Sequence, residues 1–99
     1  MTREEALQHI RAAFPVLRDV YGISSIDIFG SVARNEAQPG SDIDLLVSFQ
    51  PGKVCGYFSF FHLQQELEGI LGARVDLVTP DALKKQLRAS ILAEAIHAA

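Results

Sequence analysis

Residues 41–49 read SDIDLLVSF and form the most strand-like stretch of the sequence. The turn signal Pro39-Gly40 comes directly before this stretch. Because side chains alternate between the two faces of a strand, Asp42 and Asp44 share one face. The continuous apolar run Leu45-Leu46-Val47 is typical of a central strand. The sequence therefore predicts two acids on the same face of a central strand.

These two carboxylates are candidate metal ligands. On a strand, the Cα atoms of Asp42 and Asp44 lie roughly 6.5 to 7 Å apart, and both side chains can then bind hard divalent cations. Unpaired charges in a central strand would cost several kcal/mol each in desolvation unless a cation or hydrogen bonds compensate. A bound metal explains the pair more simply than a solvated face does.

Helical and strand-like patterns alternate along the rest of the chain. Thr2 and Glu5 form a capping-box pattern at the start of the first helix, and Pro15 is expected to kink or divide that helix. In chain order we expect a helix over 2–21, a strand over 26–29, a short helix over 31–35, the strand 41–49, a helix over 58–71, a strand over 74–79 and a helical region over 81–98. This order predicts an α/β or α+β fold, with helices packed on a small mixed sheet of three or more strands.

A candidate phosphate-binding turn lies at Gly30-Ser31, where the strand 26–29 ends and a short helix begins. Backbone N–H groups of such a turn, together with the Ser31 hydroxyl, can bind phosphate oxygens. Glycine at this position lets the backbone approach a ligand closely. Arg34 is a further candidate contact to phosphate or ribose, although a solvated position on the short helix explains it equally well.

A third acid, Asp76, is set into the apolar strand Val75–Val78. If this strand lies beside the strand 41–49, the carboxylates of Asp42, Asp44 and Asp76 meet at one rim of the sheet. Two divalent cations would more than neutralise them and leave a local positive charge that can receive a nucleoside triphosphate. This is the two-metal arrangement that stabilises both the attacking and the leaving oxygen of an in-line displacement.

Length and composition limit the classes of protein to consider. A chain of 99 residues, 48% of them hydrophobic, supports one domain over residues 1–99. The formal charge of −3 argues against direct nucleic-acid binding. The single cysteine, Cys55, excludes a disulfide framework within the chain, and no apolar run approaches the roughly 20 residues of a membrane span. We therefore expect a cytoplasmic protein with no membrane partner.

Gly30-Ser31, ten further residues and then Asp42-Ile43-Asp44 match the G-S-x10-D-x-D signature of a known superfamily. The chain resembles the polymerase β-like nucleotidyltransferases, and the stretch from residue 29 to residue 47 is similar to their minimal nucleotidyltransferase (MNT) branch. One departure is visible at Asn35, where many relatives have glycine. Because asparagine tolerates left-handed backbone, the turn can survive this change.

The resemblance implies specific roles for these residues. Gly30 and Ser31 would hold the triphosphate of ATP, with Arg34 beside them. Asp42 and Asp44 would bind two Mg2+ ions, for which Mn2+ could substitute. Asp76 would bind the catalytic ion and help to deprotonate the acceptor.

Minimal members of this family are typically the antitoxin of a toxin–antitoxin pair whose toxin is a HEPN-domain ribonuclease. The resemblance therefore implies transfer of AMP from ATP to a hydroxyl, expected to be a tyrosine hydroxyl, of such a partner. Two alternatives remain open at this point. The chain could neutralise the toxin by binding alone, with a vestigial metal site, or it could act on a small molecule or an RNA end.

Overall fold

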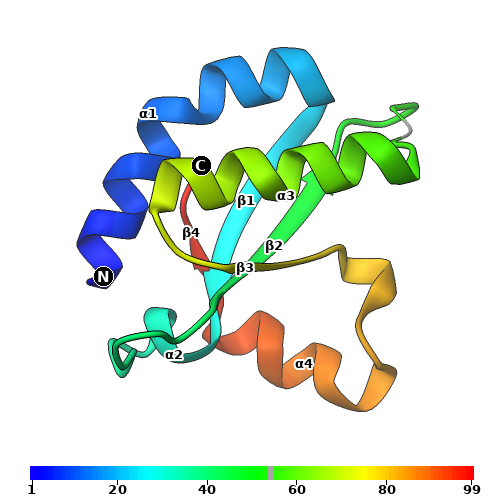
Figure 1. Ribbon diagram of the computed structural model, residues 1–99. Coiled ribbons are helices and arrows are strands. Elements are labelled where there is room, and N and C mark those ends of the chain that lie inside the picture. The colour runs from blue at the N-terminus through cyan, green and yellow to red at the C-terminus, as the bar shows by residue number, and fades with distance from the viewer. Residues whose placement is uncertain (54) are drawn as a thin grey trace.

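A four-stranded mixed sheet forms the centre of the fold, as Figure 1 shows for the computed structural model, which describes residues 1–53 and 55–99. The strands are β1 (Ile23–Phe29), β2 (Ile43–Phe49), β3 (Val75–Val78) and β4 (Ile96–His97). They lie in the order β3-β2-β1-β4, with β2 antiparallel to β1 and parallel to β3, and with β4 antiparallel to β1. The expected mixed sheet is confirmed, and the strand that carries Asp44 lies inside it.

Two long helices, α1 (Arg3–Tyr21) and α3 (Tyr57–Leu71), pack together over one face of the sheet (Figure 1). Two shorter helices, α2 (Gly30–Ala33) and α4 (Lys85–Glu94), contact each other near the end of β1. A 3-10 helix over Pro80–Ala82 precedes α4. None of the helices in the described part of the chain is both long and apolar enough to cross a membrane.

The first helix begins with the capping box that the sequence predicts. The backbone N–H of Glu5 donates to the Thr2 hydroxyl, and the backbone N–H of Thr2 donates to the Glu5 carboxylate, each at 3.2 Å. Pro15 lies inside α1 but does not divide it, because the helix runs unbroken from Arg3 to Tyr21. Figure 1 shows that the helix axis changes direction along its length, which is the milder of the two expected effects.

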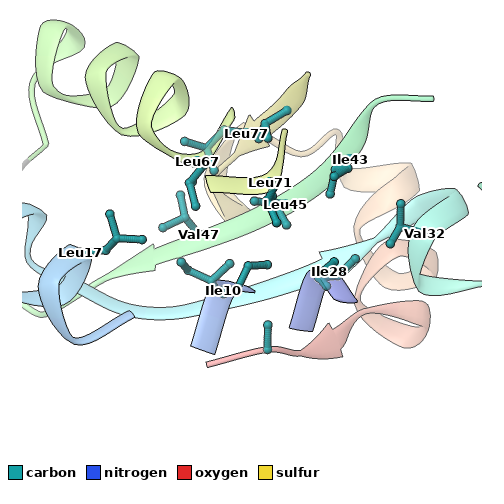
Figure 2. Close-up of a cluster of buried hydrophobic side chains, with 14 of the residues drawn as sticks. Ile10, Leu17, Ile28, Val32, Ile43, Leu45, Val47, Leu67, Leu71 and Leu77 are labelled. Carbon is teal, nitrogen blue, oxygen red and sulfur yellow. The ribbon is translucent and has the colours of Figure 1, made fainter. Parts of the chain in front are cut away.

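The hydrophobic core lies between the sheet and the two long helices (Figure 2). Leu45 and Val47 of β2 are fully buried there, against Ile10 and Leu17 of α1 and Leu67 of α3. Because these β2 residues point toward the helices, the residues that alternate with them point toward the opposite face. The core therefore fixes the face on which Asp44 lies.

The predicted helix over 81–98 is wrong at its end. Helix α4 stops at Glu94, and the chain then extends into β4 along the free edge of β1. The backbone N–H of Ala98 donates to the Ile26 carbonyl at 2.9 Å, and the Ile26 N–H donates to the Ala99 carbonyl at 2.8 Å. These bonds satisfy backbone N–H and C=O groups at the free edge of β1. The need for such a partner arises only in the folded sheet, so the helical pattern of the C-terminal segment does not reveal it.

Replacing Leu45 by alanine should lower the free energy of unfolding by about 2–5 kcal/mol, because the deleted side chain is fully buried and leaves a cavity. Chemical denaturation followed by circular dichroism measures the change. Leu87→Ala on α4 is the matched control, since Leu87 is 52% exposed and its loss should cost no more than about 0.5 kcal/mol. Equal losses at the two positions would contradict this description of the core.

Candidate active site

Asp44 and Asp76 are partners across the parallel pair of β2 and β3. Residues in register on parallel strands direct their side chains to the same face of the sheet. Ile43 and Leu45, the neighbours of Asp44 along β2, are buried in the core, so both acids lie on the face opposite to the long helices. The expectation that the strand of Asp76 lies beside the strand of Asp44 is confirmed.

Asp42 stands one residue before β2 and is less closely joined to this pair. Its side chain is 50% exposed, and its Oδ1 lies 3.2 Å from Nε of Arg74. The negative charge of Asp42 contributes less than that of Asp76 to the raised pKa of Asp44. Asp42 is therefore near the other two acids, but its carboxylate is paired with an arginine that the sequence analysis did not single out.

Asp44 is the electrostatic centre of the site. Burial raises the pKa of its carboxyl from 3.8 to about 6, with further contributions from the negative charges of Asp76 and Asp42. The positive charge of Arg34 lowers the same pKa in part. Without a cation, a charged Asp44 is thus disfavoured both by desolvation and by its acidic neighbours.

Glycine is required at position 30 for two reasons, its backbone conformation and the lack of space for a side chain. Its φ of +73° lies in the left-handed region, and a Cβ built on it would overlap Oδ2 of Asp44 and lie 3.0 Å from the Asp44 Cγ. The preceding residue, Phe29, is the partner of Asp44 in the β1–β2 ladder. Gly30 is therefore packed directly against the Asp44 carboxylate.

The turn that follows α2 keeps its left-handed residue despite the departure at Asn35. Asn35 has a φ of 59°, which glycine adopts freely and asparagine tolerates. The backbone N–H groups of Arg34 and Glu36 donate to the carbonyls of Gly30 and Ser31, at 3.1 and 2.8 Å. The expectation that the turn survives the change is confirmed.

Glu94, at the end of α4, reaches the same turn and was missed by the sequence analysis. Its Oε1 accepts a hydrogen bond from the Gly30 N–H, and its Oε2 lies 3.0 Å from Nη1 of Arg34. The Gly30 N–H, one of the groups expected from the sequence to bind phosphate, is thus engaged by a side chain of the protein itself. A signal was present in the sequence, because Glu94 is the sole acid after Asp81 and stands in an apolar stretch.

The donor set suits Mg2+ in kind, because carboxylate oxygens are the ligands that this ion prefers. Asp44 and Asp76 are in register, and their mutual repulsion would be relieved by a cation. Within residues 1–53 and 55–99, however, no group of three or more His, Cys, Asp or Glu stands ready to hold a metal ion. One oxygen of Asp42 is instead paired with Arg74, whose side chain is 80% exposed.

A hollow of about 540 Å3 lies near the starts of β2 and β3, beside the acidic site, but none of the three aspartates lines it. It is lined by residues that include Met1, Ser41, Ile43, Leu71 and Arg74. Asp76 itself is exposed. Asp42 is exposed as well, whereas Asp44 between them is half-buried.

A mixed sheet with two long helices on one face, and with paired aspartates beside a Gly-Ser turn on the other, is the arrangement of the polymerase β-like nucleotidyltransferases. The comparison with protein families agrees, since the family described as "Nucleotidyltransferase domain" matches residues 10–97. The chain belongs to this family of enzymes, as one of its minimal members.

Similar proteins cover nearly all of the chain. The protein adenylyltransferase MntA of Thermococcus cleftensis is 36% identical over 97 residues, which are 98% of this chain and 96% of that protein. A solved structure, provisionally assigned as a minimal nucleotidyltransferase, has a TM-score of 0.77 and 42% identity over 97% of this chain and 95% of its own. An MNT antitoxin in complex with a tri-AMPylated HEPN toxin of Shewanella oneidensis has a TM-score of 0.67 at 21% identity, over 95% of this chain and 71% of that chain, and shares the fold.

Gly30→Ala should cost more stability than a glycine substitution strained only in its backbone. The left-handed conformation costs roughly 1–2 kcal/mol for alanine, and displacement of the Asp44 side chain adds roughly 1–3 kcal/mol. Gly52→Ala is the control, because Gly52 has a φ of +79° but no heavy atom within 4 Å of an added Cβ. Denaturant unfolding of both variants measures the difference, and equal costs would show that Gly30 does not pack against Asp44.

Asp44 should titrate near pH 6 in the metal-free protein, as carboxyl carbon NMR can measure, and Mg2+ should move this titration to lower pH. Asp44→Asn must remove the signal.

The same shift makes the stability of the protein depend on pH. Because the folded-state pKa of Asp44 lies above the unfolded value, Asp44 makes the protein less stable as the pH rises from about 4 to about 6. The asparagine variant should therefore gain roughly 0.5–1 kcal/mol at pH 8 but nothing below pH 4, after allowance for solvent screening. A normal titration of Asp44 near pH 4 would contradict the description of the site.

Proposed function

We propose that this chain is a Mg2+-dependent protein adenylyltransferase, the antitoxin of a toxin–antitoxin pair. It transfers AMP from ATP to a hydroxyl, most simply that of a tyrosine, on a HEPN-domain ribonuclease and so neutralises the toxin. The observation that carries the proposal is the in-register pair of Asp44 and Asp76 beside the Gly30-Ser31 turn. A cytoplasmic location, where ATP and magnesium are both available, is part of the proposal.

Asp44 and Asp76, joined by Asp42 once it leaves Arg74, are the residues proposed to hold two metal ions, either Mg2+ or Mn2+. Bound there, the ions supply the positive charge that stabilises the attacking and leaving oxygens of an in-line displacement. In the ion pair of Asp42 with Arg74, the Asp42 side chain is half exposed and the Arg74 side chain is largely exposed. Breaking this pair therefore costs little free energy, on the order of 1 kcal/mol or less.

The remaining side chains of the site bind the nucleotide and move the proton. The Ser31 hydroxyl and the Arg34 guanidinium are proposed to bind phosphate oxygens, and Gly30 gives them room. Asp76 is proposed to accept the proton of the acceptor hydroxyl as its oxygen attacks the α-phosphorus. The bond from that phosphorus to the bridging oxygen breaks, and pyrophosphate leaves.

Support for a protein acceptor comes from the exposure of Asp76 and from the relatives. The acidic face carries an exposed Asp76, so a side chain of another protein can approach it. The Thermococcus relative is a protein adenylyltransferase, and the Shewanella protein of similar fold is an MNT antitoxin bound to an AMP-modified HEPN toxin. A small-molecule or RNA acceptor would need recognition that neither the exposed Asp76 nor the acidic net charge offers.

A second candidate function is neutralisation of the toxin by binding alone. The observation that favours it is the ion pair of Asp42 with Arg74, together with the lack of a ready three-ligand cluster in the described residues. The two candidates differ in what they require of the aspartates, because a purely steric antitoxin would act without them.

Incubation of the purified chain with its HEPN partner and Mg-ATP should add one or more AMP units to the partner, as intact-mass spectrometry can detect. Asp44→Asn should slow this transfer by at least about 100-fold, because it removes a ligand of both metal ions. Chelation of the metal should stop it.

The control for that variant is Asp19→Asn, at an exposed acid on α1 whose only ion pair in the described residues is with its neighbour Arg18. It should transfer AMP at the wild-type rate. If the wild-type chain adds no AMP while the double variant Asp42→Asn, Asp44→Asn still neutralises the toxin, the binding-only function is correct.

A further inference from the structure

We propose that Glu94 is a positioning residue of the nucleotide site, whose carboxylate holds the Gly30–Arg34 turn and points Arg34 toward the triphosphate. The inference rests on the proposed function, because it assigns nucleotide binding to this turn. It adds a residue from the C-terminal part of the chain, outside the Gly-Ser and Asp-x-Asp motifs.

The Glu94 carboxylate makes two contacts with the turn, one through each oxygen, and we call these two contacts the Glu94 clamp. One oxygen accepts from the Gly30 N–H at 3.0 Å, and the other pairs with Nη1 of Arg34 at 3.0 Å. Gly30 opens α2 and Arg34 is its C-cap, with the Arg34 N–H donating to the Gly30 carbonyl. A single side chain therefore spans both ends of this four-residue helix and ties them together.

The sheet, rather than the packing of α4, places Glu94 at this position. Helix α4 has no buried residue, so apolar contacts hold it only weakly. Two residues after Glu94, however, Ile96 pairs with Ile28 near the end of β1. The pairing of β4 with β1 thus places the Glu94 carboxylate beside Gly30, the first residue after β1.

Arg34 lies close enough to the acidic centre for its orientation to matter. Its positive charge lowers the pKa of Asp44, while the negative charge of Glu94 raises it slightly. In the described residues the other side-chain partner of Arg34 is Glu36, at 3.4 Å, and the Arg34 and Glu36 side chains are 47% and 67% exposed. Without Glu94, the Arg34 guanidinium would keep only this longer pair among the described residues, while the Arg34 backbone would still be bonded to Gly30.

Three variants test the clamp through the KM for ATP and kcat of AMP transfer to the partner. Glu94→Gln keeps an oxygen for the Gly30 N–H but removes the charge opposite Arg34, so KM should rise about 3- to 10-fold with little change in kcat. Glu94→Ala removes the contacts to both Gly30 and Arg34 and should raise the KM for ATP further. Glu36→Gln is the matched control, because it also removes a carboxylate from Arg34 but leaves the turn intact, and its KM should stay within about twofold of wild type.

A double-mutant cycle separates positioning from general stability. With Arg34→Ala already present, Glu94→Gln should raise KM by no more than about twofold, because the arginine that it orients is gone. The melting temperature of each variant is measured in parallel. If the wild-type chain transfers AMP, the proposed function stands. The role of Glu94 is then overturned if Glu94→Gln and Glu94→Ala leave the KM for ATP unchanged, or if they change only the melting temperature. If the wild-type chain neither binds Mg-ATP, as calorimetry measures, nor transfers AMP, the proposed function fails and the role of Glu94 falls with it.

Discussion

The parallel pairing of β2 with β3 sets Asp44 directly beside Asp76, and the rest of the site depends on this contact between like charges. Two carboxylates at neighbouring positions of a sheet repel each other, and partial burial of Asp44 removes part of the water that would screen them. An arrangement that is unfavourable by itself persists because the register belongs to the whole sheet. Neither acid can move away without shifting apolar residues that are buried in the core.

The hydrophobic core supplies the free energy that holds this arrangement. Every second residue of β2 from Ile43 onward points under α1 and α3, and a slip of one position would turn these residues to the opposite face and the acids into the core. The long helices thus cover one face of the sheet, and the acids lie on the other face, where Leu46 of β2 is also buried. On that face Asp76 is exposed and Asp44 is half-buried.

Segments far apart in the sequence meet around Asp44. The Gly30 turn packs against its carboxylate with no space for a side chain, and Asp76 arrives on the neighbouring strand. Glu94 reaches the far side of the turn because β4 adds to the edge of β1. The last residues of the chain therefore do more than complete the sheet, since they also secure the loop that is proposed to hold ATP.

Local patterns in the sequence determined most of the elements and the residues of the candidate site. Alternation along residues 41–49 identified the acidic face, the capping box located the start of α1, and Gly30 with Asp42, Asp44 and Asp76 was found from residue type and spacing. Only the tertiary structure decided the register that joins Asp44 to Asp76, the engagement of Asp42 by Arg74, and the turn of the C-terminal segment from helix to edge strand. Glu94 belongs to this second group. Its partners are about 60 residues away along the chain, and periodicity reports which face a residue occupies but not which distant backbone groups need a partner there.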